Sequence, residues 1–160
     1  MERNDQIRFT LNGNPVAYSG AATDRLLDAL RGELGCLSVK CGCGEGECGA
    51  CAVIIDGRLM NSCCVAVGAV AGASVLTLEG YRGTSRFEAI SKAFAEVSAV
   101  QCGFCTPGMV MAAEALLSRN PQPTEAEVRE GLSGNICRCT GYNAIVNAVL
   151  AASREGAGLW

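Results

Sequence analysis

The stretch on which the fold depends is Cys43-Gly-Glu-Gly-Glu-Cys-Gly-Ala-Cys51. Its three cysteines follow the spacing C-x4-C-x2-C, and only glycine, alanine and glutamate stand between them. Glycines at 42, 44, 46 and 49 can adopt positive φ angles and leave room for backbone amides beside the sulfur atoms. The stretch therefore predicts an irregular loop that wraps a centre held by thiolates.

The spacing of these three cysteines matches the loop that binds a 2Fe–2S cluster in plant-type ferredoxins. Such a cluster needs four thiolates, two for each iron, and the fourth comes from a separate element. Eleven residues separate Cys51 from Cys63, and Cys64 is the next residue. Because adjacent side chains diverge, we expect only one of these two cysteines to bind iron, and the residues alone leave open which. Cys36 and Cys41 are expected to be structural or incidental thiols.

A second set of four cysteines stands in the other half of the chain, at Cys102, Cys105, Cys137 and Cys139. Each pair comes just before a predicted helix, so two loops are expected to meet where helix N-termini and backbone amides stabilise an anionic thiolate–metal assembly. A structural zinc site with four cysteine ligands stays open from the spacing alone. The first set favours iron in the second set as well.

Composition supports metal ligation by cysteine. The chain has 11 cysteines in 160 residues and no histidine, which excludes triads and zinc sites that depend on histidine. Residues 1–6 carry no export signal, so we expect a cytoplasmic location, where thiols stay reduced and clustered cysteines bind metal. The odd number of cysteines also fits complete disulfide pairing poorly.

Charge and hydropathy narrow the class of protein further. Hydrophobic residues make up 49% and charged residues 18% of the chain, which is typical of a globular protein. The net charge of −3 gives no electrostatic basis for binding nucleic acid. No apolar run approaches the length of a membrane span.

The first half is predicted to be a small mixed sheet crossed by one helix. Strands are expected at 7–11, 16–18, 52–55, 58–60 and 75–78, from alternating apolar residues and turn signals. Thr23 is expected to cap a helix whose apolar face carries Leu26, Leu30 and Leu34. A short helix is possible at 63–67.

The second half changes to a helical period, and 80–85 is expected to be a linker. Four helices are expected at about 87–97, 107–118, 125–133 and 142–154. Pro107 suits a first helical turn, and Thr124 with Glu127 forms a capping box. The predicted class is α+β, with domains at 1–80 and 86–160.

Three motifs together resemble one family: 39–51, 101–108 and 134–142. They resemble the iron–sulfur subunit of the molybdenum hydroxylases, the xanthine dehydrogenase and aldehyde oxidase family. Small subunits of carbon monoxide dehydrogenase, nicotinate dehydrogenase and 4-hydroxybenzoyl-CoA reductase are also members. The resemblance covers about residues 7–150.

The resemblance implies a β-grasp 2Fe–2S ferredoxin-like domain followed by a four-helix 2Fe–2S-binding domain. It implies one cluster on Cys43, Cys48, Cys51 and Cys63, facing a flavin (FAD) subunit. It implies a second cluster on Cys102, Cys105, Cys137 and Cys139, near molybdopterin in a large subunit. The offset from Cys51 favours Cys63 over Cys64. Gln101 and Cys139 are expected to approach the pterin.

The expected function is therefore electron relay inside a complex, expected to be a dimer of heterotrimers, with no catalytic residue on this chain. The runs 37–40 and 77–80 look most like subunits of three-chain xanthine or purine dehydrogenases. Partners acting on nicotinate, aldehydes, aromatic-CoA esters or carbon monoxide stay open. The rivals are a stand-alone electron carrier and a zinc-stabilised interaction module. A subunit should expose apolar docking patches, and the mean hydropathy of +0.24 favours it over the carrier.

Overall fold

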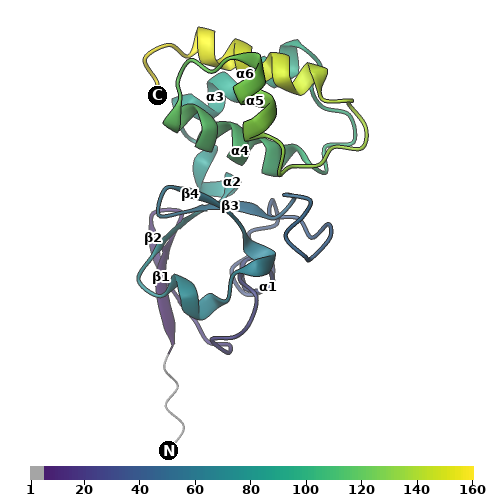
Figure 1. Cartoon of the computed structure of the whole chain (residues 1–160). Coiled ribbons are helices and arrows are strands. Elements are labelled where there is room, and N and C mark those ends of the chain that lie inside the picture. Colours follow the sequence, from purple (N-terminus) through teal and green to yellow (C-terminus); the bar gives the residue numbers. More distant parts are fainter. Residues whose placement is uncertain (1–5) are drawn as a thin grey trace, which may run out of the picture.

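The computed structural model describes residues 6–160 and consists of a strand-containing part with a helical part stacked on it (Figure 1). The prediction that the chain lacks an export signal concerns residues that lie mostly outside this range. Within residues 6–160, no helix is long and apolar enough to cross a membrane.

Five strands form one mixed sheet in the order β2-β1-β5-β3-β4. The strands are β1 (Ile7–Leu11), β2 (Asn14–Tyr18), β3 (Ala52–Ile55), β4 (Arg58–Asn61) and β5 (Ser74–Leu76). Strands β1 and β5 are parallel, and every other neighbouring pair is antiparallel. Both hairpins turn through two residues with positive φ, Asn12-Gly13 and Asp56-Gly57, as the twist of a tight hairpin requires.

Helix α1 (Leu26–Arg31) covers one face of the sheet, and its Leu26, Leu27 and Leu30 are fully buried. The predicted cap at Thr23 is wrong: the helix begins at Leu26 after Arg25, and Leu34 lies beyond its end. The cause is tertiary. The Leu26 amide donates to Val65 O at 2.8 Å, and this pairing holds Arg25 in an extended conformation.

The segment after the sheet also differs from the prediction. Strand β5 ends at Leu76, and 78–81 form a short helix, α2 (Leu78–Tyr81), where a strand end and a linker were expected. Asn12 explains the early end, because its Oδ1 accepts from the Thr77 amide at 2.8 Å and turns the chain away from the sheet. Tyr81 is buried, with 3% of its surface exposed.

The four predicted helices of the second half are confirmed: α3 (Ser85–Glu96), α4 (Thr106–Arg119), α5 (Glu125–Gly131) and α6 (Asn143–Glu155). Thr124 and Glu127 form the predicted capping box, and Pro107 lies in the first turn of α4. Two short 3-10 helices, η1 (Ser62–Cys64) and η2 (Val67–Val70), occupy the first half, and η1 agrees with the short helix foreseen beside Cys63.

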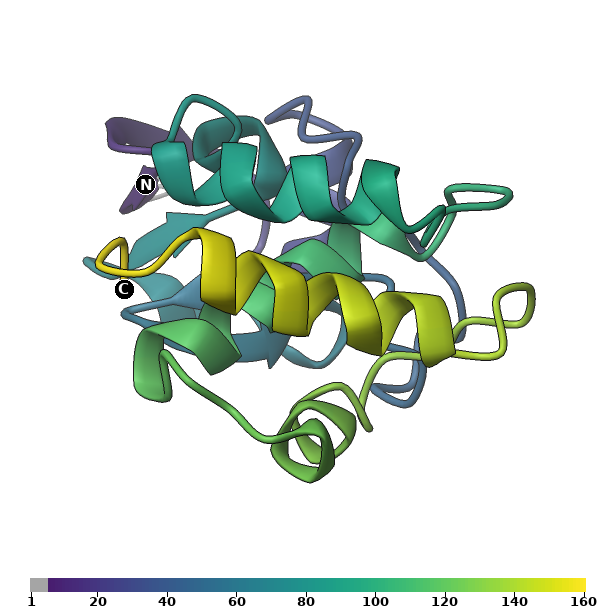
Figure 2. The same ribbon diagram turned by 90° about the horizontal axis from the view of Figure 1, so that it is seen from above.

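Helix α4 is the central element of the helical part. Ten consecutive residues, 108–117, are buried, because the helix contacts β3 on one side and α3 and α5 on others. Helices α3 and α6 lie side by side above it (Figure 2). Ile54 of β3 packs into the helical core, so the two parts of the chain share a continuous interface. The domain limits 1–80 and 86–160 stay a prediction.

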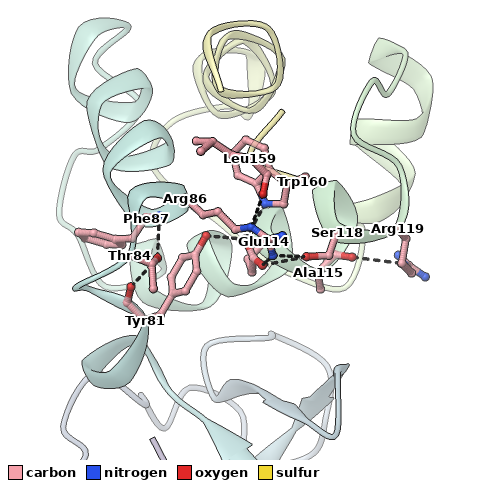
Figure 3. A network of polar contacts seen from close by, with 10 residues as sticks. All are labelled: Tyr81, Thr84, Arg86, Phe87, Glu114, Ala115, Ser118, Arg119, Leu159 and Trp160. Carbon is pink, nitrogen blue, oxygen red and sulfur yellow. Dashed lines mark hydrogen bonds and ion pairs between the residues drawn. The ribbon is translucent and has the colours of Figure 1, made fainter. Parts of the chain in front are cut away.

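A buried carboxylate, Glu114 of α4, ties four segments together (Figure 3). It accepts hydrogen bonds from Tyr81 Oη, from Arg86 Nη1 at 3.0 Å and from Trp160 Nε1 at 2.8 Å. Ser118 Oγ also donates to it, at 2.8 Å. Burial, followed by the hydrogen bond to Glu114, raises the pKa of Tyr81, so its hydroxyl remains a donor. The network fixes α2, α3 and the end of the chain on α4.

Replacing Glu114 by alanine should lower the free energy of unfolding by about 2–4 kcal/mol, because Tyr81 Oη and Trp160 Nε1 would lose their acceptor inside the protein. Urea denaturation followed by circular dichroism measures the change. The matched control is Glu96→Ala, which removes an exposed carboxylate paired with Lys92 and should cost less than about 0.5 kcal/mol. Equal losses in the two variants would contradict a structural role for the network.

Candidate metal centres

The first cysteine loop, 41–51, has no regular secondary structure, as predicted. Gly44, Gly46 and Gly49 have φ angles of 74°, 83° and 66°, which favour glycine. A Cβ atom at Gly42 would lie 2.6 Å from Cys48 Sγ. The glycines therefore allow the backbone to fold closely around the sulfur atoms.

Backbone amides point at the sulfurs of this loop. Cys43 Sγ accepts from the amides of Glu45 and Glu47, both at 3.3 Å. Cys48 Sγ accepts from the Cys43 amide at 3.3 Å. The amide hydrogen bond from Glu45, with those from Cys48 and Glu47, lowers the pKa of Cys43 to about 6. The loop thus favours a thiolate before any metal binds, as an iron–sulfur site requires.

Cys51 and Cys63 lie deeper, at the start of β3 and in η1, and both are buried. Burial raises the pKa of Cys51 to about 11, so this thiol needs a bound cation to ionise at neutral pH. Cys63 Sγ accepts from the Gly46 amide at 3.2 Å. Three of the four sulfur atoms, those of Cys43, Cys48 and Cys63, therefore accept from amides of a single loop, and the four side chains differ in depth.

The expectation that the side chains of Cys63 and Cys64 diverge is wrong. Their sulfur atoms are 3.7 Å apart within the 3-10 turn of η1. Depth still separates them: Cys63 is 5% exposed, whereas Cys64 lies at the surface. Cys36 is buried in the core under the sheet, and Cys41 is exposed.

The second set comes together as predicted, from the loop before α4 and the loop before α6 (Figure 2). Cys102 Sγ and Cys139 Sγ are 3.6 Å apart although 37 residues separate them. All four cysteines of the set line one cavity of about 160 Å³, and Cys48 of the first set lines it too. The cavity is therefore a candidate metal centre, and the first cysteine loop borders it through Cys48.

Thr140 controls the ionisation of Cys137 in this set. Burial acts to raise the pKa of Cys137, but hydrogen bonds from Thr140 Oγ1 at 3.1 Å and the Thr140 amide outweigh it and lower the pKa to about 7. Burial and the neighbouring Cys137 raise the pKa of Cys105 to about 12. In each set, then, hydrogen bonds favour the anion of one thiol, Cys43 or Cys137, and another thiol with a raised pKa, Cys51 or Cys105, needs a bound cation to ionise.

Exposed apolar side chains surround the second set. Val100, Phe104 and Ile136 are 41%, 47% and 51% exposed, and Phe104 and Ile136 line the cavity with the cysteines. Gln101 lies at the surface beside Cys102. Val100, Phe104 and Ile136 form the kind of apolar patch expected of a subunit.

The two loops also touch, a contact that the sequence did not disclose. The Ile136 amide donates to Cys48 O at 2.9 Å, and Asn135 Nδ2 donates to Gly49 O at 3.0 Å. The only sign in the sequence was the placement of Asn135 and Ile136 directly before Cys137 in a recurrent motif.

Among residues 6–160, no three cysteine, aspartate or glutamate side chains surround a single point as ligands of one ion.

Comparison with known proteins gives two family matches. Residues 9–72 match the 2Fe-2S iron-sulfur cluster binding domain, and residues 77–150 match the [2Fe-2S] binding domain. Each match contains one of the two cysteine sets. The amide-to-sulfur hydrogen bonds and the all-cysteine donor sets fit such clusters.

Whole-length relatives agree. The chain is 46% identical to the nicotinate dehydrogenase small FeS subunit of Eubacterium barkeri, over 89% of this chain and 91% of the relative. It is 46% identical to the xanthine dehydrogenase iron-sulfur-binding subunit of Escherichia coli O157:H7, over 90% and 91%.

A solved structure extends the likeness to a longer chain. The aldehyde oxidoreductase of Desulfovibrio desulfuricans ATCC 27774 superposes with a TM-score of 0.88 at 41% identity, over 94% of this chain and 17% of that one. The same two-part fold therefore occurs as a separate subunit and as part of a larger oxidoreductase. The chain belongs to the family of iron–sulfur subunits of the molybdenum hydroxylases.

Proposed function

We propose that this chain relays electrons one at a time from a molybdopterin centre, through two 2Fe–2S clusters, to flavin. The observation that carries the proposal is the pair of four-cysteine sets on loops that touch each other. A 2Fe–2S cluster, when bound, supplies one-electron chemistry. The chain itself provides thiolates, amide donors and a fixed separation between the two sets.

The proposed ligands of the first cluster are Cys43, Cys48, Cys51 and Cys63. The proposed ligands of the second cluster are Cys102, Cys105, Cys137 and Cys139. Burial and the amide hydrogen bond from Gly46 favour Cys63 over Cys64. Amides directed at Cys43, Cys48 and Cys63 would stabilise the negative charge that a cluster gains on reduction.

The exposed patch at Val100, Phe104 and Ile136 supports a partner subunit on the side of the second set. We assign this side to the large molybdopterin subunit, with Gln101 and Cys139 nearest the pterin. The side of Cys43 would face an FAD subunit. A dimer of such heterotrimers, located in the cytoplasm, completes the proposal.

The substrate of the complex is proposed from the sequence runs 37–40 and 77–80, which favour xanthine or another purine. Nicotinate is the second candidate, because the relative named for nicotinate is as similar to this chain as the one named for xanthine, at 46% identity. These substrates would bind to the large subunit, so we expect no residue of this chain to contact them.

The function is tested on the complex purified with its native partners. Two clusters predict about four iron atoms and four acid-labile sulfides for each copy of this chain. Anaerobic addition of xanthine should bleach the visible cluster bands, and nicotinate is the parallel arm. A colourless chain that contains zinc and no sulfide would overturn the relay. Bleaching by nicotinate alone would overturn only the purine assignment.

Cys63→Ser should remove the first cluster, because Cys63 is the buried thiol that accepts from the Gly46 amide. About two of four irons should be lost, while the electron paramagnetic resonance (EPR) signal of the second cluster persists. Cys64→Ser is the matched control and should keep both signals. The reverse pattern would show that Cys64 is the fourth ligand.

A further inference from the structure

The contact between the two cysteine loops is built around one side chain, Asn135. This residue is 4% exposed, although it lies in the loop between α5 and α6. Its backbone amide donates to Leu132 O at 2.9 Å, which anchors it to the end of α5. Its Nδ2 atom then reaches Gly49 O, 86 residues away in the first cysteine loop, at 3.0 Å.

Two glycines that lie beside Asn135, Gly49 and Gly108, have no room for a side chain. A Cβ atom at Gly49 would collide with Gly134 O and with the Asn135 amide group. A Cβ atom at Gly108, in the first turn of α4, would collide with Gly49 O and would lie 3.2 Å from Asn135 Nδ2. The first loop is thus held between Asn135 and α4 at the closest approach that backbone atoms allow.

A second hydrogen bond runs parallel to the first. The Ile136 amide donates to Cys48 O at 2.9 Å. Cys48 is a proposed ligand of the first cluster, and Ile136 precedes Cys137, a proposed ligand of the second. One hydrogen bond therefore connects the backbone of a ligand of the first set with that of the residue next to a ligand of the second. Electron tunnelling between two centres falls steeply with their separation, so a contact that fixes this separation sets the rate.

We propose that Asn135 is a positioning residue that sets the separation of the two clusters, by binding Gly49 O and keeping the Ile136–Cys48 hydrogen bond closed. The proposal rests on the proposed function, because it concerns transfer between the two clusters. Among the described residues, the side-chain amide of Asn135 makes no hydrogen bond to a cysteine sulfur. Asn135 would therefore act on the two clusters through the loops that it joins. Its loss should change how the clusters interact while leaving each cluster bound.

Two variants test the proposal on the complete complex. Asn135→Ala removes the donor to Gly49 O. Gly108→Ala keeps Asn135 and places a methyl group against Gly49 O, which should push the first loop away from α4. Alanine is a good helix former, and Gly108 lies in a helix, so the second variant adds only the collision. One variant loses a hydrogen bond and the other gains a steric collision, and both are expected to change the separation of the two clusters.

The controls match each variant in chemistry. Asn143→Ala removes another asparagine side chain, which lies at the surface and accepts a hydrogen bond from Arg129. Gly83→Ala adds a methyl group at an exposed glycine with nothing within 4 Å of the added Cβ. Neither control residue belongs to the proposed cluster sites.

The readout is the EPR spectrum of the fully reduced complex, in which two nearby paramagnetic clusters split each other's signals. Wild type and both controls should show the splitting. Asn135→Ala and Gly108→Ala should lose part or all of it with iron and sulfide unchanged, and electron transfer between the clusters should slow in rapid-mixing experiments. If Asn135→Ala does not assemble, Gly108→Ala decides.

The outcomes separate this inference from the proposed function. Wild-type splitting in a Gly108→Ala complex that holds both clusters would overturn the positioning role and leave the relay standing. A wild-type complex without two reducible clusters would overturn the relay itself. Equal loss of splitting in a variant and its control would also count against Asn135.

Discussion

The hydrogen bonds from Ile136 to Cys48 O and from Asn135 to Gly49 O are the constraint on which the organisation of this molecule depends. Each cysteine set is assembled by its own part of the chain. These contacts, together with the packing of α4 against β3, bring the two sets next to each other. A buried polar side chain such as Asn135 is stable only when its hydrogen bonds are made. Breaking the hydrogen bond to Gly49 O would leave a buried donor without an acceptor, which costs free energy.

Glycine makes this closeness possible at several points for the same steric reason. Gly42 leaves space for Cys48 Sγ, and Gly49 and Gly108 allow two backbones to touch. Because glycine has no side chain, backbone amides of the first loop can approach the sulfur atoms and donate hydrogen bonds to them. The lowered pKa of Cys43, about 6, follows from those amide donors, and the lowered pKa of Cys137, about 7, follows from the hydroxyl and amide of Thr140.

The helical part provides a rigid support for this arrangement. Helix α4 starts at the second cysteine loop and carries Glu114 further along, where the carboxylate binds Tyr81, Arg86 and Trp160. One helix therefore connects the cysteine end of the bundle to α2, α3 and the last residues of the chain. Sites that must hold a fixed separation are best built on such elements.

Much of this could be predicted from the sequence because the signals are local. The spacing of the cysteines, the capping box at Thr124, the hairpin turn at Asp56-Gly57 and the helical periods after residue 85 depend on neighbouring residues, and the structure agrees with them. Two of the wrong predictions, the start of α1 and the end of β5, concern places where a distant partner decides. Helix α1 starts late because Val65 holds the chain before it, and β5 ends early because Asn12 captures Thr77.

By itself, the sequence predicted two groups of cysteines on an α+β chain, with Cys63 and Cys64 both open as the fourth member of the first group, since spacing and period depend on residues that are near one another in the chain. The tertiary structure alone decided which of Cys63 and Cys64 is buried, and that Asn135 and Glu114 are buried at junctions between segments. The physical reason is separation along the chain. Asn135 meets Gly49 across 86 residues and Tyr81 meets Glu114 across 33, and no local pattern specifies which distant carbonyl or carboxylate a side chain will reach once the core has packed.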